Sequence, residues 1–268
     1  MKFKMAYRHI VAFNLIASFL IGCTSAPAET VSISNPKHDE PMVISPTNSP
    51  TATTIPQSSL TPKLMDYEFP DLIDPAKHYL FYLHGKIIEE LGNPAISPDY
   101  GKYEYEAILE KLSGFGFVVI SEQRSKNTDG VEYARKITKQ VKTLISAGVQ
   151  EKNITVVGAS KGAGIVFFVS HFLENEELDF FIMAICHPDY VDSLKQDQIF
   201  LYGNVLSIYD SADEFAGSCQ KLFSFSDNKG ISRYDEVILN IGTGHGILYK
   251  PLDEWILPVV QWADKDTK

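Results

Sequence analysis

Short apolar runs alternate along the chain with longer segments that have helical character. An uninterrupted apolar run flanked by polar residues is typical of a strand buried on both faces, and such runs occupy residues 79–83, 117–120, 154–157, 180–185, 205–209 and 237–241. Apolar residues at helical spacing, or a longer apolar segment, predict helices at 105–112, 131–145 and 162–173. This alternation predicts an α/β fold, with a mostly parallel sheet of about six strands covered by helices on both faces.

The first 22 residues have the pattern of a targeting segment. Three basic residues precede an apolar stretch at 10–21, which is too short to cross a membrane comfortably and which ends in LIGC at 20–23. This order resembles the signal peptide and lipobox of bacterial lipoproteins. The resemblance implies that residues 1–22 are a lipoprotein signal peptide and that Cys23 is lipidated after cleavage. Cleavage after the AxA sequence at 26–28, or an uncleaved anchor, remains the alternative.

The segment that follows is expected to be a flexible tether. Residues 23–57 are rich in Ser, Thr and Pro and poor in large apolar residues, so they cannot bury enough surface to offset the entropy of ordering. The folded domain is therefore expected at 58–268. A lipid and a tether predict a protein anchored outside the cytoplasm in the bacterial envelope, facing the periplasm or the cell surface. That compartment permits disulfides, so Cys186 and Cys219 either pair or remain separate buried thiols.

Composition limits the kind of partner. The chain has 268 residues, of which 44% are hydrophobic, and a formal net charge of −10. A chain of this length can bury a substantial core, whereas its negative charge argues against a nucleic-acid partner. The sequence contains no HExxH motif or paired CxxC motifs, so we expect no metal and no cofactor. A small-molecule substrate is the expected partner.

Residues 158–162 carry the strongest chemical signal. They read GASKG, directly after the apolar run at 154–157 and directly before a predicted helix. A serine on such a tight strand-to-helix turn has a strained backbone and an exposed Oγ near the helix N-terminus. The glycine spacing does not fit a phosphate-binding loop or a dinucleotide-binding motif. The pattern therefore predicts Ser160 as a nucleophile.

The arrangement around Ser160 resembles the α/β-hydrolase family, with its serine esterases and lipases, over residues 79–262. In that family the acid follows a late strand and the histidine follows the last strand. The resemblance implies a catalytic triad of Ser160, Asp213 and His245. Asp210 stands where the family usually has glycine, and this departure leaves it as the alternative acid.

The family resemblance also indicates an oxyanion hole. His84 and Gly85 follow the first clear apolar run and resemble the HG turn of the family. The implied donors are the backbone N–H groups of Lys161 and of either Lys86 or Gly85, each typically worth about 2.7–4 kcal/mol of transition-state stabilisation. The extra glycines of the HGGG form are absent.

The resemblance implies a serine hydrolase, of the carboxylic-ester type, that acts through an acyl-enzyme. The connection at 187–203 is too short for a large cap domain, which favours small or accessible acyl substrates. Tyr100, in the long loop at 86–103, is a candidate substrate contact. Arg124 and His187, which follow two other predicted strands, are further candidates, although an arginine at such a place more commonly forms a structural ion pair.

Functions of other kinds remain compatible with these patterns. The domain could have lost activity and serve as a binding protein tethered to the envelope. A peptidase or an acyltransferase could use the same triad. Lys161 could also form a Ser-Lys catalytic pair, an arrangement that is less favoured while His245 is available. The reactivity of Ser160 separates the binding protein from the enzymes.

Overall fold

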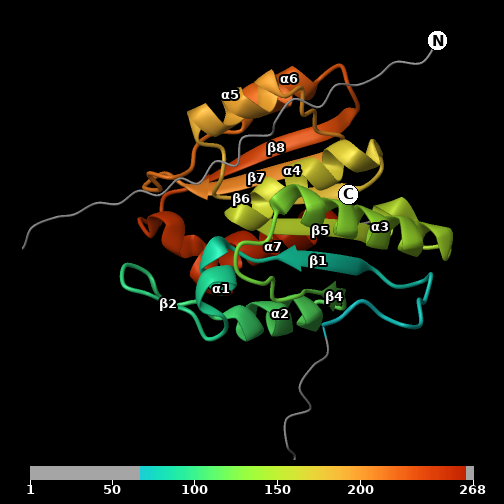
Figure 1. Ribbon diagram of the computed structural model, residues 1–268, viewed down its shortest axis with the longest axis horizontal. Coiled ribbons are helices and arrows are strands. Elements are labelled where there is room, and N and C mark those ends of the chain that lie inside the picture. Colours follow the sequence, from blue (N-terminus) through green and yellow to red (C-terminus); the bar gives the residue numbers. More distant parts are fainter. Residues whose placement is uncertain (1–66, 264–268) are drawn as a thin grey trace, which may run out of the picture. The chain divides into compact units, whose positions relative to one another are not determined.

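The computed structural model describes residues 67–263. The expected signal peptide, the expected lipidation site Cys23 and the expected tether lie outside these residues, as does the expected start of the folded domain. The six-stranded sheet found within residues 67–263 has the strand order β4-β1-β5-β6-β7-β8, and each neighbouring pair is parallel. The expected fold class is therefore confirmed (Figure 1).

The strands of this sheet follow the apolar runs closely. They are β1 (Tyr79–Leu83), β4 (Val118–Ile120), β5 (Ile154–Ala159), β6 (Asp179–Met183), β7 (Gly203–Asp210) and β8 (Ile231–Leu239). A separate antiparallel hairpin joins β2 (Ile96–Ser97) to β3 (Gly101–Lys102).

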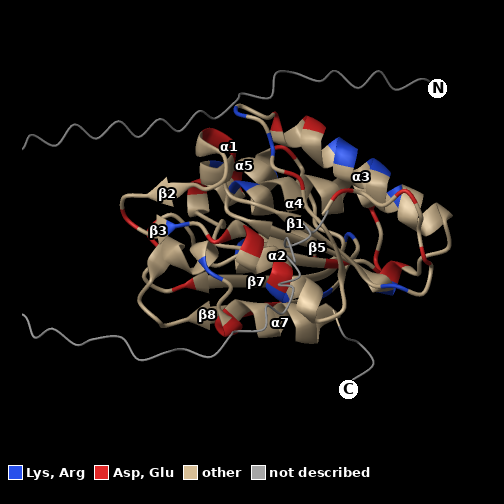
Figure 2. Ribbon diagram, turned by 90° about the horizontal axis from the view of Figure 1, so that it is seen from below, with Lys and Arg blue, Asp and Glu red and all other residues tan. Residues whose placement is uncertain are grey.

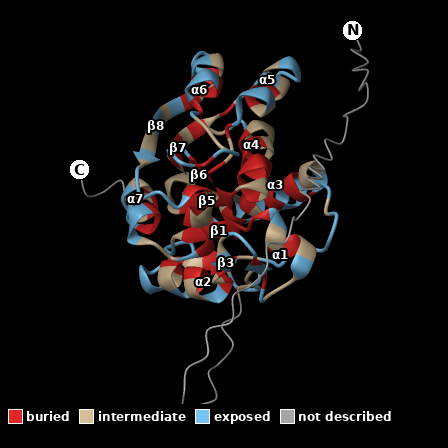
Figure 3. Ribbon diagram, turned by 90° about the vertical axis from the view of Figure 1, so that its left-hand side faces the viewer, coloured by how far each residue is buried: buried red, intermediate tan, exposed pale blue. Residues whose placement is uncertain are grey.

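Helices cover both faces of the sheet. They are α1 (Lys86–Leu91), α2 (Tyr105–Gly114), α3 (Gly130–Ser146), α4 (Lys161–Leu173), α5 (Pro188–Gln196), α6 (Gln220–Ser226) and α7 (Asp253–Ala263). Helices α3 to α6 share one buried cluster with alternate strand residues such as Phe81 and Val156. Helices α1, α2 and α7 share a second cluster with the intervening residues, such as Tyr82 and Val157. Because successive strand residues point to opposite faces, both faces must be apolar, and the central strands are buried (Figure 3).

Some elements differ from the sequence-based expectation. β8 begins at Ile231 rather than at residue 237, and it ends at Leu239. It is an edge strand whose side chains are mostly half-buried or exposed, so its first half carries no apolar run. The loop expected at 86–103 contains α1 and the β2–β3 hairpin, and the connection after β6 contains α5. These elements are too short to show a clear periodic spacing of apolar residues. For the same reason, the sequence did not predict α6.

Basic residues recur along α3, where the ribbon is blue in Figure 2. Arg135, Lys136, Lys139 and Lys142 are exposed there, whereas Ile137 and Val141 face the core. This pattern is that of an amphipathic surface helix. Across residues 67–263, no helix combines the length and the apolar character needed to cross a bilayer.

Candidate active site

Ser160 lies at the turn between β5 and α4. Its backbone angles are φ 50° and ψ −117°, a conformation that non-glycine residues rarely adopt and that costs of order 1–3 kcal/mol. The turn is held because the Ser160 N–H donates to the Met183 carbonyl at 2.9 Å, and the Ser160 carbonyl accepts from the Gly164 N–H at 3.1 Å. A strained turn of this kind presents a serine side chain at the carboxyl edge of the sheet.

Gly158 and Gly162 flank Ser160, and both must be glycine because there is no space for a side chain at either position. A Cβ added to Gly162 would lie 1.9 Å from the Leu83 carbonyl oxygen, and one added to Gly158 would lie 2.5 Å from the Gly162 carbonyl oxygen. Non-bonded atoms do not approach this closely. The GASKG spacing therefore reflects the close packing of β1, β5 and α4 around the serine.

Asp213 and His245 are joined by a hydrogen bond. His245 Nδ1 lies 2.7 Å from Asp213 Oδ2, which connects the loop after β7 to the short 3-10 helix η2 (Gly244–Tyr249) after β8. The Asp213 side chain is fully buried, and its Oδ1 accepts from the Phe215 N–H at 2.9 Å. Because Nδ1 faces the carboxylate, Nε2 is the ring nitrogen left to accept a proton from a hydroxyl group.

A series of close contacts connects the η2 segment to the turn beside Ser160. The Tyr249 ring, at the end of η2, has its centroid 5.0 Å from that of Tyr103. A Cβ added to Gly85 would lie 3.9 Å from the Tyr103 ring and 3.7 Å from Ser160 Cβ. The segments that carry Ser160, Gly85 and His245 therefore meet at the carboxyl edge of the parallel sheet, where α/β folds bind their ligands.

Asp210 has a different environment from Asp213. It is fully buried, and it accepts from the Ala212 N–H at 2.9 Å and from the N–H groups of Ile241 and Gly242, both at 3.1 Å. Burial raises the pKa of Asp210, but these and a further backbone hydrogen bond from Gly244 outweigh burial, so the pKa lies below its ordinary value of 3.8. Asp210 thus holds together the two loops that carry Asp213 and His245.

Asparagine substitutions should distinguish the role of Asp213 from that of Asp210. If His245 activates Ser160, we expect Asp213→Asn to lower kcat for a reaction at Ser160 by about 10⁴-fold, because an amide cannot hold the correct His245 tautomer or stabilise the imidazolium. We expect Asp210→Asn to lower the free energy of unfolding while kcat per folded molecule stays within about tenfold. Steady-state kinetics and urea unfolding check both outcomes.

The pH dependence gives a second readout for Asp210. A carboxyl with a lowered folded-state pKa contributes stability above its ordinary pKa, and that contribution disappears as the pH falls through the folded-state value. The stability difference between the parent and Asp210→Asn should therefore shrink at acid pH. A larger loss of kcat in Asp210→Asn than in Asp213→Asn would contradict the assignment of roles.

The HG turn supplies one candidate oxyanion donor. Lys86 and Lys161 are the first residues of α1 and α4, so their backbone N–H groups have no acceptor within the helix. Lys86, as the first residue of α1, is the turn's candidate donor, and the N–H of Gly85, immediately before it, is the alternative.

His84 is a buried, neutral support for this turn. Its Nε2 accepts from the Arg124 backbone N–H at 2.9 Å, so its Nδ1 carries the proton and donates to the Gly85 carbonyl at 2.9 Å. Burial, together with the nearby Arg124 cation, lowers the His84 pKa to about 3. The imidazole therefore stays uncharged at neutral pH.

Arg124 and Lys161 both pair with Glu89. The Arg124 side chain has no exposed surface, and its Nε lies 3.3 Å from Glu89 Oε2. Lys161 Nζ lies 2.5 Å from Glu89 Oε1. For Arg124 this is the structural ion pair that the sequence left open, and full burial places the guanidinium out of reach of a substrate. The ammonium of Lys161 is also paired with Glu89, so it is not placed to act as the base of a Ser-Lys pair.

The other candidate contacts lie nearer to solvent. The half-buried Tyr100 has its ring centroid 6.3 Å from that of His245. Phe215, which sequence reasoning missed, packs edge-on against His245 at 5.8 Å and is 63% exposed. The only sequence signal for Phe215 is its place two residues after Asp213. His187 caps the N-terminus of α5, immediately before Pro188, and its side chain is 46% exposed.

Cys186 and Cys219 form a disulfide, with their Cα atoms 5.2 Å apart. Cys186 follows β6, and Cys219 lies immediately before α6. The bond therefore closes a loop of chain that includes Asp213. In the part of the chain that the structure describes, no group of three or more His, Cys, Asp or Glu side chains is placed to hold a metal ion.

Comparisons with solved structures give distant likenesses. SOBER1 from Arabidopsis thaliana is 12% identical, with a TM-score of 0.48, over 72% of this chain and 100% of that chain. A CIB-like hydrolase from Thermoplasma acidophilum is 19% identical, with a TM-score of 0.45, over 71% and 88%. The propionate-bound esterase Est2 from Thermogutta terrifontis is 15% identical, with a TM-score of 0.47, over 74% and 85%.

No family model matches this chain, and no curated protein matches it in sequence. Because the structural likenesses have TM-scores below 0.5, the assignment of the site rests on the geometry of this chain alone.

Proposed function

We propose that the protein is a serine hydrolase that cleaves carboxylic esters through an acyl-enzyme, with Ser160, Asp213 and His245 as its triad. The observation that carries this proposal is the 2.7 Å contact between Asp213 and His245, combined with the strained turn at Ser160. A hydrogen-bonded acid and histidine, with a serine held on such a turn, form the constellation needed for nucleophilic catalysis.

The proposed mechanism has two stages. His245 Nε2 takes the proton from Ser160 Oγ as Oγ forms a bond to the ester carbonyl carbon, and the backbone N–H groups of Lys86 and Lys161 stabilise the oxyanion. When the tetrahedral intermediate collapses, the carbon–oxygen bond to the alcohol breaks, and the alcohol takes the proton from His245. Water then attacks the acyl-enzyme with His245 as base, the acid is released, and Ser160 regains its proton. Asp213 stabilises the imidazolium in both stages.

The surroundings of His245 favour an uncharged acyl or alcohol group. Phe215 and Tyr100 present aromatic surface next to the imidazole. Apolar surface of this kind contributes binding free energy to hydrocarbon groups at roughly 25 cal/mol per Å² buried. We place Tyr100 and His187 among the substrate contacts and exclude Arg124, because the Arg124 side chain is buried. The short connection between β6 and β7 supports an accessible site.

The cellular location is part of the proposal. The sequence at the N-terminus supports a lipid on Cys23 and a place in the bacterial envelope, outside the cytoplasm. The Cys186–Cys219 disulfide supports an oxidising compartment, because such bonds are rare in the reducing cytosol.

Reaction with a fluorophosphonate probe tests the proposed function. We expect the purified protein to be labelled, the label to map to the peptide that contains Ser160, and short-chain p-nitrophenyl esters to be hydrolysed. Inclusion of amide and acyl-acceptor substrates separates an esterase from a peptidase or an acyltransferase. A correctly folded protein that neither reacts with the probe nor hydrolyses any substrate would instead be a binding protein.

A further inference from the structure

Glu89 is a buried carboxylate held between two cations. It lies on α1, and its side chain has no exposed surface. Its Oε2 lies 3.3 Å from Arg124 Nε, and its Oε1 lies 2.5 Å from Lys161 Nζ. A carboxylate is costly to bury unless it is paired and hydrogen-bonded, and here both oxygens are used. Glu89 therefore links α1 to two other segments, the one after β4 and the start of α4.

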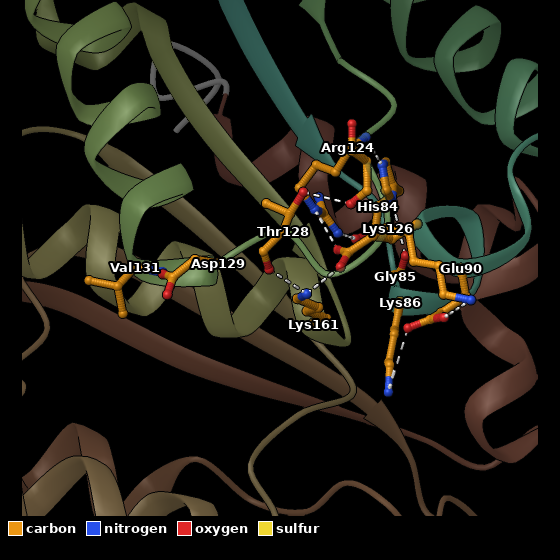
Figure 4. Close-up of polar contacts among 12 residues, drawn as sticks. His84, Gly85, Lys86, Glu90, Arg124, Lys126, Thr128, Asp129, Val131 and Lys161 are labelled. Carbon is orange, nitrogen blue, oxygen red and sulfur yellow. Dashed lines mark hydrogen bonds and ion pairs between the residues drawn. The ribbon is translucent and has the colours of Figure 1, made fainter. Parts of the chain in front are cut away.

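The contact with Lys161 connects Glu89 to the nucleophile turn, which is the turn at Ser160 between β5 and α4. Lys161 directly follows Ser160, and its backbone N–H is one of the proposed oxyanion donors. Its Nζ also donates to the Thr128 carbonyl at 2.8 Å (Figure 4). Because two acceptors hold the ammonium, the first turn of α4 is tied through this side chain to α1.

The contact with Arg124 reaches the HG turn. Arg124 Nη2 donates to the His84 carbonyl, and the Arg124 backbone N–H donates to His84 Nε2 (Figure 4). His84 in turn holds the Gly85 carbonyl. The helix that carries Glu89 begins at Lys86, the other proposed donor. Glu89 is therefore connected to that donor through its own helix and through Arg124.

We propose that Glu89 is a positioning residue that fixes the spacing between the Lys86 and Lys161 backbone N–H groups of the oxyanion hole. The inference rests on the proposed function. Oxyanion donors act at about 2.7–3.1 Å from the developing charge, so a small displacement of either group weakens binding of the transition state. Binding of the ground-state ester depends much less on this spacing.

The first test is Glu89→Gln, which keeps the shape of the side chain and removes its charge. We expect kcat per active site, titrated with a fluorophosphonate, to fall by about 10- to 100-fold, with KM within twofold of the parent. A trifluoromethyl ketone forms a tetrahedral adduct with the serine and places an oxyanion in the hole. Its affinity should fall by about the same factor as kcat. Glu90→Gln is the matched control, because Glu90 is partly exposed and contacts Lys126 and Lys86 at the surface.

Two further variants distinguish a positioning role of Glu89 from an effect of the changed charge and from a failure to fold. Lys161→Gln removes one link at a partly exposed side chain and leaves Glu89 paired with Arg124, so we expect a folded protein with weakened ketone affinity. The double variant Glu89→Gln/Lys161→Gln has the same net charge in this cluster as the parent. We expect its losses to be smaller than the product of the single losses, because the two residues form one link.

Several outcomes would overturn the inference. One is parent-like kcat and ketone affinity in the folded, titrated Glu89→Gln protein. If that variant does not fold, parent-like values in Lys161→Gln have the same meaning. A loss in Lys161→Gln with none in Glu89→Gln would show that the Lys161 charge matters and the link does not. If the proposed function itself were wrong, the result would be different: the parent protein would neither react with the fluorophosphonate nor hydrolyse the ester.

Discussion

Ser160→Ala is expected to lower ester turnover by about 10⁶-fold and to abolish fluorophosphonate labelling, because no acyl-enzyme can form without Oγ. The thermal midpoint should change little, since the side-chain oxygen is removed without adding volume and the turn keeps its backbone hydrogen bonds to Met183 and Gly164. The measurements are p-nitrophenyl ester hydrolysis, probe labelling and a thermal melt on the same preparation.

Ser211→Ala provides the matched control for this experiment. Ser211 is an exposed serine whose Oγ lies 2.8 Å from Asn240 Oδ1, and we expect parent-like turnover and labelling. If Ser160→Ala kept more than about 1% of the parent activity, far above the residual rate expected without a nucleophile, the reaction would proceed through another group and the proposed triad would be wrong.

The second large effect is expected at Gly162. An added Cβ would lie 1.9 Å from the Leu83 carbonyl oxygen and 2.8 Å from the His84 carbonyl oxygen. Both are backbone atoms, so no side chain can move aside and β1 must separate from α4. We expect Gly162→Ala to destabilise the fold by more than about 4 kcal/mol, at the extreme of single substitutions, and to give mostly insoluble or unfolded protein. Soluble yield and urea unfolding measure the effect.

Gly114→Ala tests whether the effect is specific to this glycine. Gly114 is the last residue of α2, and a Cβ added there would have no described atom within 4 Å apart from its chain neighbours and the backbone of its own helix. Alanine in a helix is favoured over glycine by roughly 0.5–1 kcal/mol, so this variant should be as stable as the parent or slightly more stable. A soluble, active Gly162→Ala protein would contradict the packing described for the nucleophile turn.

The buried strands could be predicted, and the triad could be proposed, because each leaves a local signal in the sequence. Strands buried on both faces must be apolar throughout, and the glycines around Ser160 are fixed by space. The start of β8 could not be predicted in this way, because an edge strand needs few apolar residues. The arrangement of Asp213 and Asp210 also depends on which N–H groups of distant loops reach each carboxylate, and no spacing in the sequence records that.

Glu89 shows why the rest of the site was not predicted. In the sequence it is one of two adjacent glutamates on a short amphipathic segment, and such residues usually face solvent. Its burial results from the approach of Arg124 and Lys161 from two other segments. Arg124 itself was considered as a substrate contact because it follows a strand, and only the tertiary structure shows the carboxylate that it meets.

The disulfide between Cys186 and Cys219 determines how the protein should be produced. The two cysteines are 33 positions apart, and a crosslink that closes a loop of this length stabilises a fold by about 3–4 kcal/mol on the chain-entropy account. Protein expressed in a reducing cytoplasm, or purified with dithiothreitol, would lose that contribution around the loop that carries Asp213. Export to an oxidising compartment and buffers free of thiols are therefore the conditions in which these activity assays should be run.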